Sequence, residues 1–164
     1  MPSHNRQQLS AHILPLSVAN DFAGACREWR LVDIELSDDW GSCPCGQSIK
    51  EHCYIQNRVN GHTTWVGNVC IRRFMQIDTG NLFSGLRRIA ANDTASPNID
   101  VIGYAHRRGY LYGDNEYRFL SDTLRKRNLT PKQLAWRQKI NRRILRQIVV
   151  KSRNEVPQTV PLGQ

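Results

Sequence analysis

The chain has 164 residues, with 23 Lys and Arg against 14 Asp and Glu, and its formal net charge is +9. This length suits one ordinary domain, or two small modules that share a core. No apolar run is long enough to span a bilayer, and the first twenty residues lack the charged-then-apolar layout of a secretory signal. We therefore expect a cytoplasmic protein, in a reducing compartment where cysteines stay as thiols.

The chain is predicted to begin with a loose segment, a short helix and a strand. Residues 1–19 are polar and are expected to be flexible. Asn20-Asp21 then caps a helix whose apolar positions follow a 3.6-residue period: Phe22, Ala25, Cys26 and Trp29. Arg30 to Leu36 alternates strictly between its two faces, which is typical of a strand that pairs beside a neighbour.

Four of the five cysteines follow within a short stretch of the chain: Cys43, Cys45, Cys53 and Cys70. The first two belong to Cys43-Pro44-Cys45-Gly46. Proline stiffens such a turn, and glycine permits the positive φ that lets backbone N–H groups point at the thiolates. This segment is therefore interpreted as a metal-binding knuckle.

A β-hairpin is predicted after the knuckle. Two strand-like segments flank Asn60-Gly61, which is a strong signal for a two-residue turn. With that loop, Ile55 lies opposite Val66 and Cys53 lies opposite Asn68. Asn68 is also a good N-cap for a helix over residues 69–76, and this helix would hold Cys70 in its first turn, where a thiolate is favoured.

The four cysteines together predict one structural zinc ion in a closed tetrahedral site. A hairpin module of this size buries too little apolar surface to be stable alone, so the metal would hold it together. His52 is an alternative to Cys53, but neighbouring strand residues face opposite ways and only one of them can bind. A set of reduced, buried cysteines is the other interpretation.

The layout resembles small, mostly uncharacterised zinc modules of phage, giant-virus and mobile-element proteins. Their shared pattern is C-x-C-G, then C-Y-I with an Asn, then N-G, then V-G-x-x-C and a Phe. In this chain the pattern is carried by Cys43 to Gly46, Cys53 to Ile55, Asn57, Asn60-Gly61, Val66-Gly67, Cys70 and Phe74. The resemblance covers about a fifth of the chain. It implies a zinc fold in a viral or phage setting and no specific activity.

Residues 77–150 are predicted to form a basic region of about four helices, and residues 151–164 a flexible tail. The expected helices are Leu82 to Ala91, a second from Ser96-Pro97 to about Gly109, a third from Asp114 to Arg127, and a fourth from Thr130-Pro131 to about Val149. The predicted fold class is therefore α+β. A zinc-stapled hairpin module with its helix and strand, residues 20–76, precedes these helices.

The positive charge is concentrated in the helical region. Residues 1–76 have seven basic and seven acidic side chains, whereas residues 77–164 have sixteen and seven. No Asp or Glu occurs in residues 128–152, although a merely solvated helix usually mixes signs for i,i+4 pairs. In the fourth helix an apolar ridge is expected to face inward: Trp136, Ile140, Ile144 and Ile148. The candidate phosphate contacts are Arg125, Lys126, Arg127, Lys132, Lys139, Arg142, Arg143 and Arg146.

These patterns predict a non-catalytic zinc protein of phage or mobile-element origin that binds DNA or RNA through its basic helices. The alternative is an interaction factor that binds an acidic surface of a host enzyme, such as RNA polymerase, through the same residues. A zinc-fold nuclease is a third class, but the chain has none of the common catalytic motifs. Tyr54 and Trp65, beside Arg58, are a further candidate surface, either for stacking bases or for packing.

Overall fold

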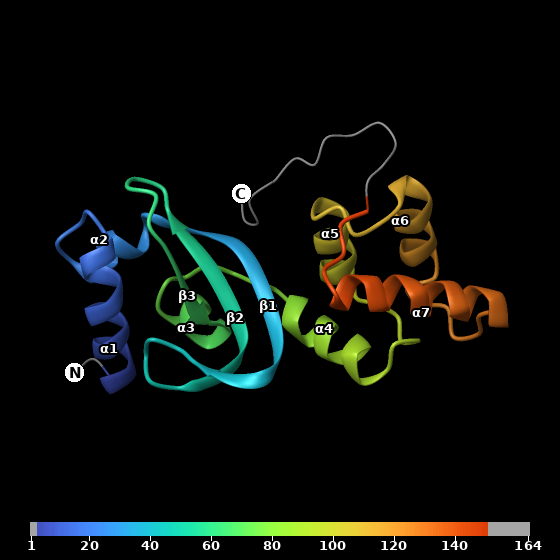
Figure 1. Ribbon diagram of the computed structural model, residues 1–164, viewed down its shortest axis with the longest axis horizontal. Helices are drawn as coiled ribbons and strands as arrows, with labels where there is room; N and C mark the ends of the chain where they lie inside the picture. Colours follow the sequence, from blue (N-terminus) through green and yellow to red (C-terminus); the bar gives the residue numbers. More distant parts are fainter. Residues whose placement is uncertain (1–2, 151–164) are drawn as a thin grey trace. The chain divides into compact units, whose positions relative to one another are not determined.

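The computed structural model describes residues 3–150, which divide into two compact units, residues 3–79 and residues 80–150 (Figure 1). The expected flexible tail, residues 151–164, lies outside the described residues. The fold contains α-helices and a three-stranded antiparallel sheet, which confirms the predicted α+β class. Within residues 3–150 no helix is both long enough and apolar enough to cross a membrane.

Unit 1 begins with a helix where the sequence predicted a loose segment. Helix α1 (His4–Ile13) starts after Ser3, whose side chain accepts a hydrogen bond from the backbone N–H of Arg6, and a short 3-10 turn, η1 (Leu14–Leu16), follows it. The side chains of Leu9 and Ile13 are fully buried. These two residues lie one turn apart on the same face of the helix, and their burial holds α1 against the rest of the unit.

The next two elements match the prediction in kind and differ in extent. Helix α2 (Phe22–Cys26) is capped by Asp21, as expected, and it is shorter because Trp29 already belongs to strand β1 (Trp29–Ser42). Strand β1 does not alternate strictly. A bulge between Leu31 and Asp33 shifts the pleat by one residue, so that Leu31 and Ile34 are both buried.

The hairpin of β2 (Ser48–Asn57) and β3 (Thr63–Gly67) forms, but its register differs from the prediction by two residues. Cys53 pairs with Val66, and Ile55 pairs with Thr64. The cause is a four-residue loop, which the Asn57 side chain organises by accepting hydrogen bonds from the two following backbone N–H groups at residues 59 and 60. A shift of two keeps every strand residue on its predicted face, because the side-chain period of a strand is two.

Unit 1 closes with helix α3 (Asn68–Arg73), which is shorter than predicted. Its N-cap is Gly67, and Asn68 is the first helical residue. The order of the sheet is β1-β2-β3, so β2 is its central strand. The sheet residues Ile34, Cys53, Ile55 and Val66 are at most 1% exposed and form the core of the unit together with residues of α1.

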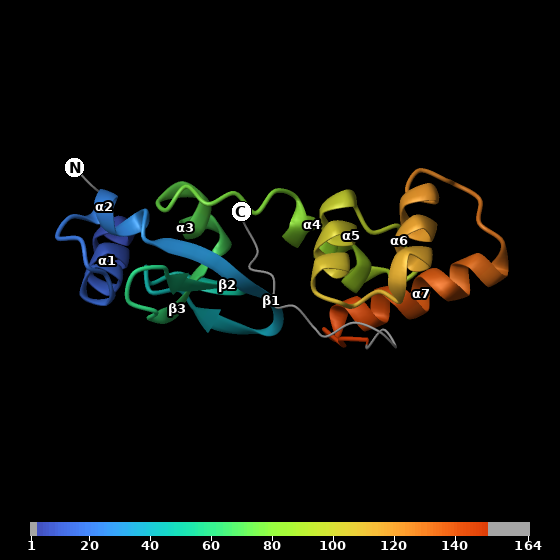
Figure 2. The same ribbon diagram turned by 90° about the horizontal axis from the view of Figure 1, so that it is seen from above.

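Unit 2 contains four helices within the described residues: α4 (Leu82–Ala91), α5 (Ile99–Arg107), α6 (Gly113–Asp122) and α7 (Pro131–Leu145). Helix α4 has the predicted bounds, and Thr130 starts α7 with a complete capping box, also as predicted. Helix α5 starts later than expected, because Asn98 and not Ser96 supplies the capping side chain. Helix α7 lies across the other helices of its unit (Figure 2).

The core of unit 2 is formed by one apolar side chain or more from each helix. Ile89, Ile102, Leu120, Ile140 and Ile144 are at most 2% exposed. The predicted inward ridge of α7 is correct for its two central residues only. Trp136 is 39% exposed and Ile148 is 47% exposed, because α7 ends at Leu145 and because Trp136 stacks on Phe119 at the edge of the core, with 4.1 Å between ring centroids.

Candidate functional site

Three of the four cysteines predicted as ligands come together in unit 1. The Sγ atoms of Cys43, Cys45 and Cys70 all lie within 4.8 Å of one another, and each residue is at most 4% exposed. In a tetrahedral zinc site with Zn–S bonds of about 2.3 Å, the sulfur atoms are about 3.8 Å apart. The three sulfurs therefore have a spacing that is compatible with ligands of one metal ion.

The local fold brings the sulfurs together through a tight turn and a helix start. The turn between β1 and β2 is closed by hydrogen bonds from the Cys43 N–H to the Gln47 carbonyl (2.8 Å) and from the Gly46 N–H to the Cys43 carbonyl (2.9 Å). Gly46 has a φ of +94°, as the sequence predicted. The Gly67 N–H donates to Cys43 Sγ at 3.3 Å, just before the helix that carries Cys70. Such N–H donors favour the thiolate form.

Helix α1 covers the knuckle, which the sequence analysis missed. Asn5 Nδ2 donates to Cys45 Sγ at 3.9 Å, and the His12 imidazole hydrogen-bonds with Thr64 Oγ1 at 2.7 Å. A Cβ on Gly46 would clash with Gln8 Oε1, so the helix approaches the turn closely. Asn5, Gln8 and His12 recur at helical spacing beside the Ser3 cap, and this was the signal available in the sequence.

A hydrogen bond between two of the sulfurs shifts their pKa values in opposite directions. A hydrogen bond from the Cys70 thiol lowers the pKa of Cys43 to about 5, and further hydrogen bonds from backbone N–H groups act in the same direction. The same hydrogen bond raises the pKa of Cys70. One thiolate thus suppresses ionisation of its neighbour, and three adjacent thiolates require a positive ion between them.

Cys53 and His52 are not part of this group. Cys53 is fully buried. Burial, and to a smaller extent the nearby charge of Cys43, raises the pKa of its thiol to about 12. In the observed register Cys53 pairs with Val66 and not with Asn68. The helix that carries Cys70 therefore begins two residues beyond the partner of Cys53. His52 lies on the opposite face of the sheet from Cys53, where its ring stacks on that of Tyr54 with 6.5 Å between the ring centroids. The close group therefore contains three of the four cysteines that the sequence predicted as ligands.

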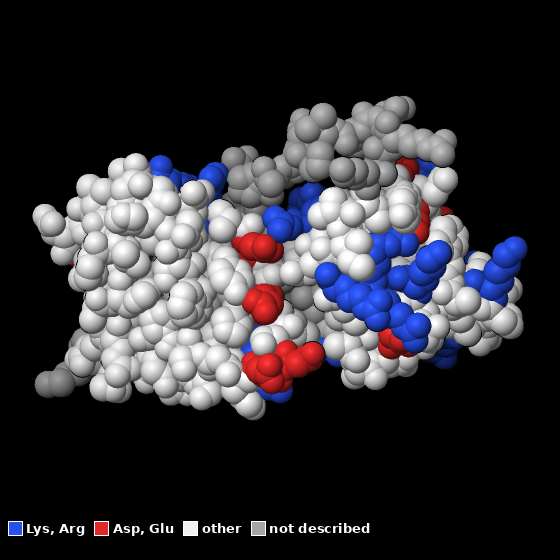
Figure 3. Space-filling model, viewed as in Figure 1, with Lys and Arg blue, Asp and Glu red and all other residues white. Residues whose placement is uncertain are grey.

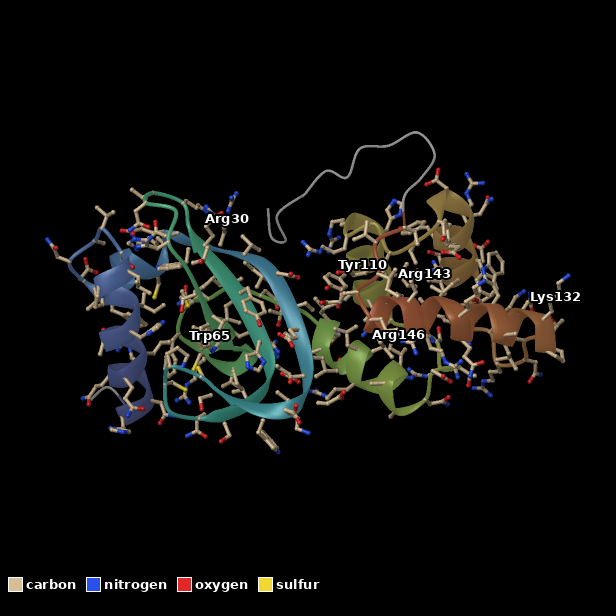
Figure 4. All side chains as sticks on the ribbon, viewed as in Figure 1. Arg30, Trp65, Tyr110, Lys132, Arg143 and Arg146 are labelled. Carbon is tan, nitrogen blue, oxygen red and sulfur yellow. The ribbon has the colours of Figure 1, made fainter. Side chains whose placement is uncertain are left out.

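Arg143, one of the predicted phosphate contacts, is turned into the core of unit 2 (Figure 4). It is 8% exposed, and its guanidinium donates to both carboxylate oxygens of Glu116, at 2.6 and 3.2 Å. It also donates to the Tyr110 carbonyl at 3.0 Å and lies over the Tyr112 ring. Because these contacts satisfy and bury the guanidinium, Arg143 is structural and is removed from the candidate interface.

The seven other predicted contacts are exposed: Arg125, Lys126, Arg127, Lys132, Lys139, Arg142 and Arg146. The first three lie in the loop after α6 and not in its last turn, and the other four project from α7 within an arc of about 80° at 100° per residue. Figure 3 shows basic side chains gathered over this part of unit 2. Within residues 3–150, Arg142 alone among the seven forms an ion pair, with Asp93 at 2.6 Å. We call these seven residues the basic surface.

The outer face of the hairpin is the other predicted surface. Tyr54 pairs with Trp65 across the two strands, and Trp65 is 43% exposed. Neither ring is free to reorient without losing a contact, because Trp65 Nε1 donates to the Ser42 carbonyl at 3.0 Å and the Tyr54 hydroxyl donates to Glu35 at 2.6 Å. The carboxylate of Glu35 makes this face less favourable for phosphate than the basic surface of unit 2.

The cysteine group (Cys43, Cys45 and Cys70) in unit 1 and the basic surface in unit 2 are therefore the candidate functional features of the described residues. The first can hold a soft metal ion in a buried position, and the second can attract an extended anion. Compared with known proteins, the chain matches no family model, no curated protein and no solved structure.

Proposed function

We propose that the protein binds nucleic acid non-catalytically through phosphate contacts from the basic surface. The observation that carries this proposal is that six of the seven exposed basic side chains have no carboxylate partner within residues 3–150. A surface kept only for solubility normally mixes charges of both signs. Phosphate backbones attract such a surface independently of base sequence.

The dimensions of α7 fit this role. From Lys132 to Arg146 the helix rises by about 21 Å, since each residue adds 1.5 Å. This length corresponds to the rise of about six base pairs along the axis of a DNA duplex, at 3.4 Å per base pair. Lys132, Lys139 and Arg146 recur along it at seven-residue intervals, so that several phosphates can be contacted at once.

We further propose that Cys43, Cys45 and Cys70 hold one zinc ion, which stabilises unit 1. Thiolate ligands favour zinc over harder cations, and the low exposure of all three residues would keep the ion buried. Three protein ligands leave the fourth tetrahedral position to a further donor. When bound, the ion offsets two of the three thiolate charges and links the knuckle to the start of α3. The β1–β2 turn and the helix are then fixed beside the sheet.

The experiment that tests nucleic-acid binding is a salt titration with a paired-lysine variant. Fluorescence anisotropy of a labelled duplex should show binding by the wild-type chain that weakens steeply with salt. Lys132→Gln combined with Lys139→Gln should lower affinity and make the log–log salt slope shallower by about 1.8, since each lost phosphate contact removes about 0.9.

The matched control carries the same charge change in unit 1, at the exposed residues Arg27 and Arg58. Arg27→Gln combined with Arg58→Gln should leave the slope close to the wild-type value. Equal effects of the two double variants would show that net charge, and not the basic surface, attracts the nucleic acid. Absence of wild-type binding at low salt would overturn the proposal, and saturable capture of an acidic protein would then support the interaction-factor alternative.

A further inference from the structure

A hollow of about 470 Å³ opens in unit 2 where the end of α4 meets the second half of α7. Its walls are Ala90 and Ala91 of α4, Asn92 and Asp93 of the following loop, and Arg142, Leu145 and Arg146. The hollow is open to solvent and its lining is mostly polar, which suits a charged ligand at the surface rather than an enclosed apolar molecule. The two alanines create the space, because larger side chains at these exposed positions would occupy it.

Arg142 is held in one orientation at this hollow. Its Nε donates to Asp93 Oδ2 at 2.6 Å, and the other oxygen of the same carboxylate accepts a hydrogen bond from Gln138 Nε2 at 2.9 Å. The loop itself is fixed by Asn141, which is fully buried and donates to the backbone carbonyls of Asp93 and Ala95, both at 2.8 Å. Because Asp93 uses only Nε, the two terminal nitrogens of Arg142 remain for a ligand.

Arg146 stands one helical turn further along the same wall, about 6 Å from Arg142 along the axis. It is exposed, and within residues 3–150 it forms no ion pair. It is the C-cap of α7, and Figure 4 shows it at the end of this helix that lies beside α4. Two guanidinium groups at this spacing can grip one phosphate from two sides, since each presents a planar fork of donors.

We propose that this hollow is a subsite for one unpaired nucleotide of a single-stranded nucleic acid. Its phosphate binds between Arg142 and Arg146, and its base and sugar lie against the apolar atoms of Ala90, Ala91 and Leu145. Asp93 is a positioning residue that orients Arg142. This inference rests on the proposed function and narrows it to single strands, because a nucleotide within a duplex must first be unstacked and unpaired to enter a hollow.

The first test is the variant Asp93→Asn. Two explanations of binding predict opposite results for it: attraction of the nucleic acid by net positive charge, and orientation of Arg142 by Asp93. The substitution removes a negative charge, so attraction by charge alone predicts tighter binding. Positioning predicts weaker binding, by about threefold to tenfold, because Arg142 must then be ordered during binding. The probe is a fluorescein-labelled oligothymidylate of about twelve nucleotides, a usual length for one single-strand site. Far-UV circular dichroism and the melting temperature confirm that the variant is folded.

The second test fills the hollow without changing charge. In Ala91→Leu the new side chain occupies the space, while α4 keeps a good helix former at an exposed position. We expect weaker binding of the oligothymidylate and unchanged binding of a duplex. Ala11→Leu, at an exposed position of α1 in unit 1, is the matched control and should bind both probes as the wild-type chain does.

The outcomes separate this inference from the proposed function. If the wild-type chain binds neither probe, both are wrong. If it binds the single strand, and either Asp93→Asn binds equally or more tightly or Ala91→Leu keeps full affinity, the subsite is wrong and the basic surface alone carries binding. Weaker single-strand binding by both variants, with duplex binding unchanged in Ala91→Leu, supports the subsite.

Discussion

Replacement of Arg143 by leucine is expected to destabilise unit 2 strongly, although its neighbour Arg142 tolerates substitution. Arg143 and Glu116, whose guanidinium and carboxylate form the ion pair, are 8% and 5% exposed. Without Arg143, the carboxylate keeps only the hydrogen bonds from the Tyr112 N–H and from Trp136 Nε1. Removing one partner of such a buried pair costs about 3–5 kcal/mol of unfolding free energy, because the other charge stays buried and uncompensated.

Urea denaturation followed by far-UV circular dichroism measures this loss, because urea does not screen charges and unit 2 is mostly helical. The matched control is Arg142→Gln, whose side chain is 54% exposed and whose ion pair is worth about 0–1 kcal/mol. The double variant Arg143→Leu, Glu116→Leu should regain most of the lost stability, since no charge remains buried. The reasoning is refuted if Arg143→Leu costs no more than Arg142→Gln.

Three further predictions concern unit 1. Cys70→Ser should lower the zinc content of the purified chain and the stability of unit 1. The control Cys26→Ser, outside the cysteine group, should leave the zinc content and the stability unchanged. An unchanged zinc content in Cys70→Ser would contradict the proposed ligands. Hydrogen bonds from a side-chain amide and from backbone N–H groups hold the pKa of Glu28 below its ordinary value of 4.5, so its contribution is present above that pH and is lost as pH falls through the folded value. In Glu28→Gln the urea concentration at the midpoint of unfolding should therefore fall less steeply between about pH 6 and 3 than in the wild-type chain. An equally steep fall in both would exclude Glu28 as the cause of the pH dependence. Gly46→Ala should weaken zinc binding in a chelator competition more than Gly61→Ala, because both have positive φ but only the first would contact helix α1; equal effects would leave backbone strain alone as the cause.

The sequence determined those features that depend on neighbouring residues. The caps at Asp21 and Thr130, the bounds of α4 and the positive φ of Gly46 were all predicted correctly. Each involves a hydrogen bond or a steric preference within about one helical turn. Such interactions are already specified when only the local residues are known. The faces of the hairpin strands were also correct, because alternation in a strand is a local property.

Contacts between distant residues decided the remaining features. The hairpin loop is held by distant partners, since Asn57 Nδ2 donates to Glu28 Oε2 at 2.7 Å and Asn60 Nδ2 donates to the Leu16 carbonyl at 2.9 Å. The longer loop moved the register and left Cys53 outside the cysteine group. Arg142 and Arg143 are adjacent in sequence and 100° apart on the helix, so packing brought one to Asp93 at the surface and the other to Glu116 in the core. No local pattern contains those partners, because they lie on other elements of the chain. The sequence therefore specified which residue types could bind a metal or a phosphate, and only the tertiary structure decided which of them are in a position to do so.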